Sequence, residues 1–206
     1  MELQQSFIYH SNMLAMMIFS FSGVLAIQTK KNDLIGVIIL GTITAIGGGT
    51  LRDILLDRQV FWLYDTNYLL IPIIGSIIIF YMPPFFRRIE NIIDYLDGIG
   101  LALFVSSVSS SLSQEGYSPS VVITMGIITG VFGGMIRDII MNREPIILGR
   151  TFYITPAFLG AASCAILQPR IGSTWAIVIS FLLISILRSL AIKYRWYLPN
   201  FLVQKD

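Results

Sequence analysis

Two short segments of the chain place an arginine and an aspartate directly after a cluster of glycines. Residues 41–58 read GTITAIGGGTLRDILLDR, and residues 126–143 read GIITGVFGGMIRDIIMNR. Both segments are otherwise largely apolar, and an ionised side chain inside an apolar span is costly enough to indicate a function. A cation halfway along a water-filled path can gate it, tune its conductance or hold an anionic lipid headgroup. The pairs Arg52–Asp53 and Arg137–Asp138 are therefore the first candidates for a functional site.

A constant offset of 85 residues relates the two segments, as Arg52 and Arg137 illustrate. The same offset aligns further identical residues, namely Gly48 with Gly133, Gly49 with Gly134, Thr44 with Thr129, Asp53 with Asp138, Phe19 with Phe104 and Tyr68 with Tyr153. Self-similarity at a fixed period indicates a duplicated structural unit.

The glycines themselves, Gly47, Gly48 and Gly49 in one segment and Gly133 and Gly134 in the other, admit two interpretations. Each weakens a helix by roughly 1 kcal/mol and uncovers the backbone, which predicts kinked or broken helices whose carbonyls line a wet cavity. The alternative is a face of small residues that packs closely against another helix. The symmetric recurrence, followed each time by an ion pair, favours the first interpretation.

The side chains around the glycines suit weak coordination of a monovalent cation. Neighbouring residues on a helix lie about 100° apart, so we expect each arginine to pair with groups on other helices. Thr44 and Thr129 carry neutral hydroxyls of the kind that line cation paths, although such groups also form hydrogen bonds between helices. Tyr153 fits either a gate or an interfacial anchor.

Other charged residues have simpler explanations. Asp94 and Asp97 open an apolar span, where capping of the helix explains them. Arg188 lies in the last turn of another span, where its long side chain can reach the interface. Four basic residues in loops mainly set the topology, with a weaker role in holding anionic lipid; these are Lys30, Lys31, Arg87 and Arg88.

The composition is that of a membrane protein. The 206 residues are 55% hydrophobic and 13% charged, and the mean hydropathy is +0.76, whereas soluble proteins are about 25% charged. A net charge of +2 gives no basic face for nucleic acid. One cysteine and one histidine exclude an internal disulfide and a Cys/His zinc site. Since no catalytic constellation is present either, we expect no enzyme, no cofactor and no tightly bound metal.

Seven stretches are long enough to cross a hydrocarbon core of about 30 Å. They are Phe7–Ile27, Leu34–Leu56, Tyr68–Met82, Ile92–Leu112, Ser120–Met141, Phe152–Leu167 and Ser173–Ile192. They form a single membrane domain over residues 1–206, with a first repeat over 7–83, a second over 92–168 and an unpaired helix over 173–192. Because each repeat has an odd number of spans, the second copy is inverted. The predicted fold is an all-α 3+3 inverted repeat plus a seventh helix, with helices 2 and 5 kinked or broken and a site between the halves.

The basic residues also predict the orientation. With the N-terminus on one side, that side receives two basic loop residues, Arg58 and Arg170, and the other side receives nine. Positive charge collects in the cytoplasm, so we expect the N-terminus outside and the C-terminus in the cytoplasm.

The motifs GGGTLRD and FGGMIRD, at matched positions in an inverted repeat that covers the chain, resemble those of bacterial members of the TRIC family, the trimeric intracellular cation channels. The resemblance implies a homotrimer in the bacterial inner membrane, with one pore per protomer for potassium and sodium beside the glycine clusters. It also implies pore or gating roles for the glycine, Arg and Asp residues of the two motifs. Animal members carry a lysine in the fifth span that is associated with phosphoinositide, and the fifth span here has none.

Two functions follow from these patterns. The first is a potassium-permeable channel whose pore runs between the repeats. The second is a secondary transporter of a small solute such as glycine, since inverted repeats with interrupted helices are also the plan of transporters.

Overall fold

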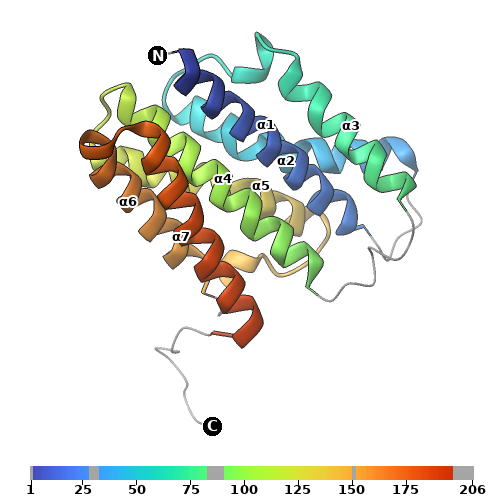
Figure 1. The fold of residues 1–206 in the computed structure, drawn as a ribbon. Coiled ribbons are helices and arrows are strands. Elements are labelled where there is room, and N and C mark those ends of the chain that lie inside the picture. Colours follow the sequence, from blue (N-terminus) through green and yellow to red (C-terminus); the bar gives the residue numbers. More distant parts are fainter. Residues whose placement is uncertain (1, 28–32, 83–90, 150–151, 197–206) are drawn as a thin grey trace.

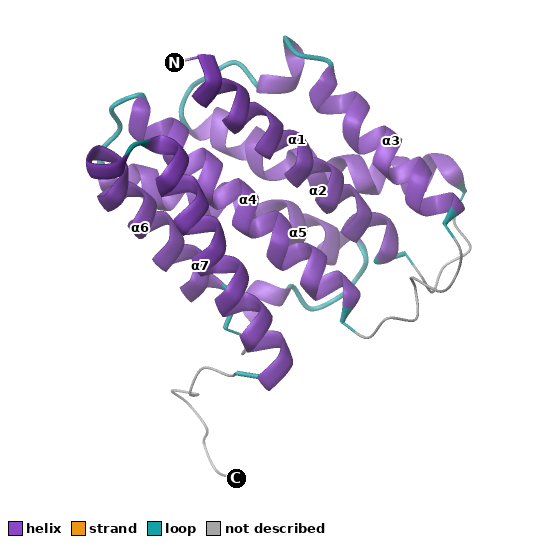
Figure 2. Cartoon of the chain, viewed as in Figure 1, coloured by secondary structure: helices purple, strands orange, loops and turns teal. Residues whose placement is uncertain are grey.

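The structure is a computed structural model that describes residues 2–27, 33–82, 91–149 and 152–196. All regular structure in these residues is helical, as predicted (Figures 1 and 2). The seven α-helices are α1 (Glu2–Leu25), α2 (Leu34–Leu55), α3 (Asn67–Tyr81), α4 (Ile92–Gln114), α5 (Pro119–Ile140), α6 (Ile154–Ile171) and α7 (Ser173–Tyr194). Two short 3₁₀ helices, η1 (Phe61–Leu63) and η3 (Ile146–Leu148), follow α2 and α5.

Local sequence explains where α2 and α5 begin and end. The Asp33 side chain caps α2 by accepting the N–H of Gly36 at 2.8 Å, and Pro119 fits the first turn of α5, where no N–H partner exists. Both helices end in the same turn, with left-handed φ values of 52° at Asp57 and 53° at Asn142. Asp and Asn tolerate this conformation better than most residues, so the repeat extends to the turns.

The chain is a multi-pass integral membrane protein. Within the described residues, five helices are both long and apolar enough to cross a membrane, namely α1, α2, α4, α5 and α7. The helix α3 is a shorter apolar helix of 15 residues.

The two repeats meet around α1 and α4, which lie side by side in the middle of the bundle (Figure 1). Phe19 of α1 and Phe104 of α4, which the offset pairs, stack with their ring centroids 5.4 Å apart. Equivalent residues contact each other in this way when a twofold relation joins two copies. The helix α7 has no counterpart and packs against α4 and α6.

Close contact between α2 and α5 is the second joint between the repeats. A Cβ atom on Gly48 would lie 2.0 Å from the carbonyl oxygen of Thr129, and one on Gly133 would lie 2.1 Å from the carbonyl oxygen of Thr44. These are reciprocal contacts, because Gly48 is equivalent to Gly133 and Thr44 to Thr129. Only glycine lets the two backbones approach this closely.

The glycine clusters do not interrupt the helices, so of the two predicted forms, kinked or broken, the broken form is not adopted. Both α2 and α5 are assigned as single continuous helices through their glycines. Packing against the other repeat offsets the low helix propensity of glycine, as tertiary contacts commonly do. The close-packing interpretation therefore describes Gly48 and Gly133, whose missing side chains make room for a neighbouring backbone.

Alanine at position 48 tests this contact against a control one residue away. Gly48→Ala places a methyl group against the Thr129 backbone, so we expect α2 and α5 to separate and the protein to lose about 1–3 kcal/mol of stability. A Cβ atom on Gly47 meets its nearest neighbour, Ile136 Cδ1, at 3.4 Å, so Gly47→Ala should change stability by less than about 1 kcal/mol. Thermal unfolding in detergent measures both. Equal losses for the two variants would contradict the assigned contact.

Candidate functional site

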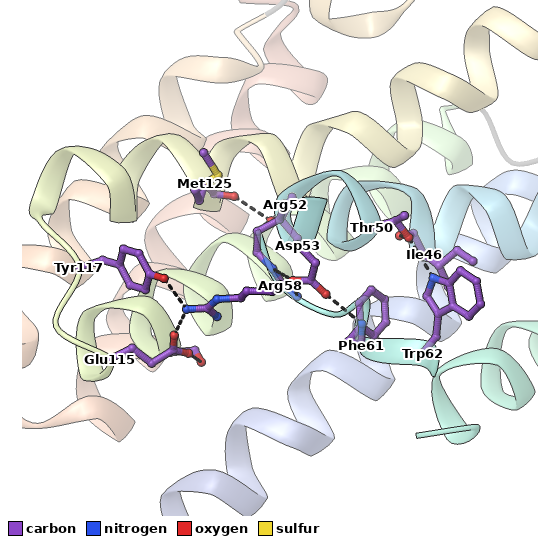
Figure 3. A network of polar contacts seen from close by, with 12 residues as sticks. Ile46, Thr50, Arg52, Asp53, Arg58, Phe61, Trp62, Glu115, Tyr117 and Met125 are labelled. Atoms are coloured by element: carbon purple, nitrogen blue, oxygen red, sulfur yellow. Dashed lines mark hydrogen bonds and ion pairs between the residues drawn. The ribbon is translucent and has the colours of Figure 1, made fainter. Parts of the chain in front are cut away.

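Arg52 sits near the end of α2 in a cluster of three groups (Figure 3). Its Nε and Nη2 atoms lie 2.8 and 2.7 Å from Oδ1 of Asp53. The second carboxylate oxygen of Asp53 accepts the backbone N–H of Phe61 at 2.9 Å, and the guanidinium carbon of Arg52 lies 5.7 Å from the Phe61 ring centroid. Asp53 thus neutralises the arginine and anchors η1. For Arg52 the expectation of a partner on another helix is wrong, because its long side chain folds back to reach the neighbouring carboxylate.

The Arg52 cluster faces a hollow of about 690 Å³ at the end of the bundle that carries the N-terminus. We call this hollow the vestibule; α1, α2 and α4 supply most of its lining, including Tyr9, Asn12, Val108 and Ser111. At its edge Arg58 donates a hydrogen bond to the Tyr117 hydroxyl at 2.9 Å and forms an ion pair with Glu115 (Figure 3). The hydrogen bond to Glu115 is the main cause that raises the pKa of Arg58.

Arg137 of α5 is the equivalent of Arg52, and it is fully buried. Its Nε and Nη2 atoms each lie 2.8 Å from Oδ1 of Asp138, whose other oxygen accepts the N–H of Ile146 at 3.3 Å. Its Nη1 atom donates to Asp97 of α4 at 2.8 Å and to the Ser22 hydroxyl of α1 at 3.0 Å. These contacts tie α5 to both repeats.

Tyr153 completes the Arg137 cluster by donating a hydrogen bond from its hydroxyl to Asp97. The cavity beside Arg137, Asp97 and Tyr153 measures about 10 Å³. A water molecule needs at least that much space, so the Arg137 cluster itself is closely packed. A hollow of about 390 Å³ lies beyond it at the same end and is lined by Ile146, Phe152 and Arg188 but not by Arg137.

Two residues that the sequence analysis explained by capping and by snorkelling belong to this cluster. Asp97 is fully buried and holds Arg137, so capping does not account for it. Arg188 of α7 is 3% exposed, donates to the Phe152 carbonyl at 3.0 Å and lies with its guanidinium carbon 4.5 Å from the Tyr153 ring centroid. The signal for Asp97 was its pairing by the offset with another polar residue, Asn12, inside an apolar span. Arg188 lies in the unrepeated helix and had no such signal.

The remaining predicted residues lie around the α2–α5 contact. The hydroxyls of Thr44 and Thr129 each donate to a carbonyl of their own helix at 2.7 Å. A Cβ atom on Gly49 would contact the Phe61 ring at 2.6 Å, and one on Gly134 would contact Asp97 Oδ1 at 2.7 Å, so these glycines make room for the two clusters. The four loop residues Lys30, Lys31, Arg87 and Arg88 lie outside the described residues.

The fold and the site define a polytopic α-helical membrane protein built from two inverted three-helix repeats, with a charged cluster at each end of a central α2–α5 contact. A family model described as "Glycine transporter" matches residues 9–84 and again 94–169, once per repeat. The UPF0126 inner membrane protein YadS of Escherichia coli is 31% identical over 97% of this chain and 98% of YadS. The chain therefore belongs to this family, the TRIC family.

Solved structures agree with the family assignment. The TRIC trimeric intracellular cation channel orthologue from Rhodobacter sphaeroides is 31% identical, with a TM-score of 0.85 over 93% of this chain and all of the other. A prokaryotic TRIC channel crystallised in 0.5 M KCl is 32% identical, with a TM-score of 0.84 over 94% of this chain and all of the other. Since these neighbours are channels, the chain is not an enzyme.

The different surroundings of the two arginines predict different costs of removing them. Arg137→Gln leaves Asp97 and Asp138 buried without a cation and should cost about 3–5 kcal/mol. Arg52→Gln leaves one carboxylate, which keeps its Phe61 hydrogen bond beside the vestibule water, and should cost about 1–2 kcal/mol. Thermal unfolding of both variants in detergent compares equivalent positions of the two repeats. A similar loss of stability at both positions would show that the second carboxylate at the Arg137 end, that of Asp97, does not add to the cost of removing the arginine.

Proposed function

We propose that the protein is a potassium-permeable channel for monovalent cations, with a pore in each protomer between the two repeats. The observation that carries this proposal is the vestibule, which leads from one end of the bundle to Arg52, just beyond the α2–α5 contact. The printed names of the two solved structures, both cation channels, support the same function. Gly47, Gly48, Gly49, Gly133 and Gly134 then line or border the narrowest part of the path.

Neutral oxygens at the α2–α5 contact supply the coordination that a monovalent cation needs. The carbonyl oxygens of Thr44 and Thr129 already point to the opposite helix at Gly133 and Gly48. When the two helices separate, these oxygens become available to a passing ion. Weak coordination by several neutral oxygens allows an ion to enter and to leave, whereas a carboxylate would bind it more strongly.

Opening requires two contacts to yield. On this proposal the closed state depends on the close α2–α5 contact and on the buried Arg137 cluster. Because Arg137, Asp138, Asp97 and Tyr153 come from different parts of the second repeat, a relative movement of its helices separates the charges and admits water. We therefore assign these residues to the gate, and Arg52 with Asp53 to the entrance.

The membrane setting follows the same reasoning. With basic loops in the cytoplasm, the vestibule faces the outside and the Arg137 cluster faces the cytoplasm. The orthologue from Rhodobacter sphaeroides is named as trimeric, and YadS as an inner membrane protein. We infer a homotrimer in a bacterial inner membrane, in contact with lipid that includes anionic species near Lys30, Lys31, Arg87 and Arg88.

A glycine transporter is the second candidate, because the description of the family model names that activity. Potassium efflux from proteoliposomes, measured beside uptake of labelled glycine into the same preparation, separates the two. We expect potassium efflux that does not saturate, with no glycine uptake above protein-free liposomes. Saturable glycine uptake without an ion leak would overturn the channel.

Arg52→Gln should raise the conductance for potassium. The variant removes a positive charge from the vestibule and leaves Asp53, and one charge at about 6 Å in water changes the energy of a cation by about 0.7 kcal/mol, or about threefold in occupancy. Single-channel recording in 0.1 M KCl measures the change, which should largely disappear in 1 M KCl because salt screens the charge.

Arg170→Gln is the control, because Arg170 is an exposed arginine near the same end of the bundle that donates to its own helix and does not line the vestibule. It should leave the conductance unchanged. An equal increase in conductance in both variants would show that the general surface charge, and not the charge in the vestibule, causes the change.

A further inference from the structure

We infer that one exchanged residue, Asn12 in the first repeat against Asp97 in the second, determines which end of the pathway is open and which is closed. This inference rests on the proposed pathway between the repeats and concerns how it is regulated. The carboxylate of Asp97 locks the Arg137 end, and the neutral amide of Asn12 leaves the Arg52 end accessible. Apart from Asp97, each charged or hydroxyl side chain that the two repeats contribute to the Arg137 cluster has an equivalent of the same residue type at the Arg52 end.

The offset of 85 residues shows how few differences separate the clusters. It pairs Arg137 with Arg52, Asp138 with Asp53, Tyr153 with Tyr68 and Ser22 with Ser107. These pairs are identical in type. Among the side chains that hydrogen-bond in the Arg137 cluster, only Asp97 is paired with a different residue, Asn12, and the ring of Phe61 is replaced by the aliphatic side chain of Ile146. The backbone contacts are repeated too, since Asp53 accepts the N–H of Phe61 and Asp138 that of the equivalent Ile146.

The hydrogen bonds of the clusters diverge at this one residue. At the Arg137 end, Arg137 donates to Asp97 and to the Ser22 hydroxyl, and the Tyr153 hydroxyl also donates to Asp97. At the Arg52 end, the Ser107 hydroxyl donates directly to the Asn12 side-chain oxygen at 2.6 Å. Tyr68 instead packs edge to face against Phe61, with ring centroids 4.7 Å apart. Arg52 keeps Asp53 as its ion-pair partner.

The consequence is visible in burial and in open space. The side chain of Arg137 is 0% exposed and that of Arg52 is 17% exposed. The space that touches Arg137 itself is about 10 Å³, and the hollow of about 390 Å³ beyond it does not reach the arginine. The vestibule of about 690 Å³ is lined directly by Arg52. A guanidinium binds a carboxylate roughly twice as strongly as a neutral oxygen, so at Arg137 the second carboxylate competes successfully with water. At Arg52 the amide does not.

The exchange can be reversed one residue at a time. Asp97→Asn gives the Arg137 cluster the groups that the Arg52 cluster has, and Asn12→Asp does the opposite. The first repeat already folds with an arginine, one aspartate and an amide, so the chain tolerates the set that Asp97→Asn creates. The double variant N12D/D97N keeps the net charge and exchanges the two ends.

Cysteine labelling reads the accessibility of each end without any transport. Cys164, the single cysteine of the chain and a buried one, is first replaced by alanine. Val108→Cys then reports on the vestibule and Val131→Cys on the space beside Arg137, and both start as buried valines. A membrane-impermeant thiol reagent is added to one side of proteoliposomes whose protein orientation has been determined.

With Asn12 and Asp97 unchanged, the thiol at position 108 should react from the side of the N-terminus, and the thiol at position 131 only slowly from the other side. We expect Asp97→Asn to raise the labelling rate at position 131 at least tenfold, and Asn12→Asp to lower the rate at position 108 at least tenfold. The double variant should show both changes. Asp33→Asn is the control, because it makes the same change of group at an exposed helix cap and should alter neither rate.

Labelling rates that stay within twofold of the parent in folded variants would overturn the inference. If Asp97→Asn does not fold, Asn12→Asp still decides the matter, because its effect is confined to the vestibule. The outcome is also separate from the proposed function. Shifted labelling in a protein that passes no potassium would keep the role of Asn12 and Asp97 and reject the channel.

Discussion

A guanidinium inside a bilayer must be accompanied by its counter-charge, and this requirement organises both ends of the molecule. The counter-charge is the aspartate that follows each arginine in the sequence, so the arginine and its partner lie on the same helix. The same aspartate accepts a backbone N–H from the 3₁₀ helix that follows. One carboxylate thus satisfies a buried charge and fixes the path of the chain after the helix. For this reason the Arg–Asp pair and its turn are repeated together.

Between the clusters, α2 before Arg52 and α5 before Arg137 carry no charged side chain. The backbones of α2 and α5 meet glycine against carbonyl, and each contact occurs twice because the repeats are related by a twofold axis. Threonine hydroxyls beside this contact bond within their own helices, so neither of these two donors is left unpaired. The middle of the membrane therefore contains only neutral carbonyl and hydroxyl oxygens at this contact, whose burial costs less free energy than that of a charge. The ionised groups lie nearer the two ends, where water is closer.

Sequence reasoning was most successful where one dominant pattern decides the structure. The seven helices follow from hydrophobicity and the inverted repeat from the constant offset, and both are confirmed. It was wrong where the partner of a side chain depends on its rotamer or on packing. Arg52 pairs with its own neighbour rather than with another helix, and Arg188 turns inward to Tyr153. The pairing of Asp97 with Asn12 contained more information than the position of Asp97 at the start of a helix.

The seventh helix adds a second difference between the two ends, in the same direction as the first. Arg188 of α7 covers the ring of Tyr153, whose hydroxyl holds Asp97. Tyr68, the equivalent of Tyr153, instead lines the open vestibule together with Arg52. A cation over the ring also favours a polarised hydroxyl that donates to the carboxylate. An exact inverted repeat would present the same closure on both sides of the membrane. On the proposed mechanism the exchange of Asn12 for Asp97 sets which side is closed, and the unrepeated helix reinforces that difference.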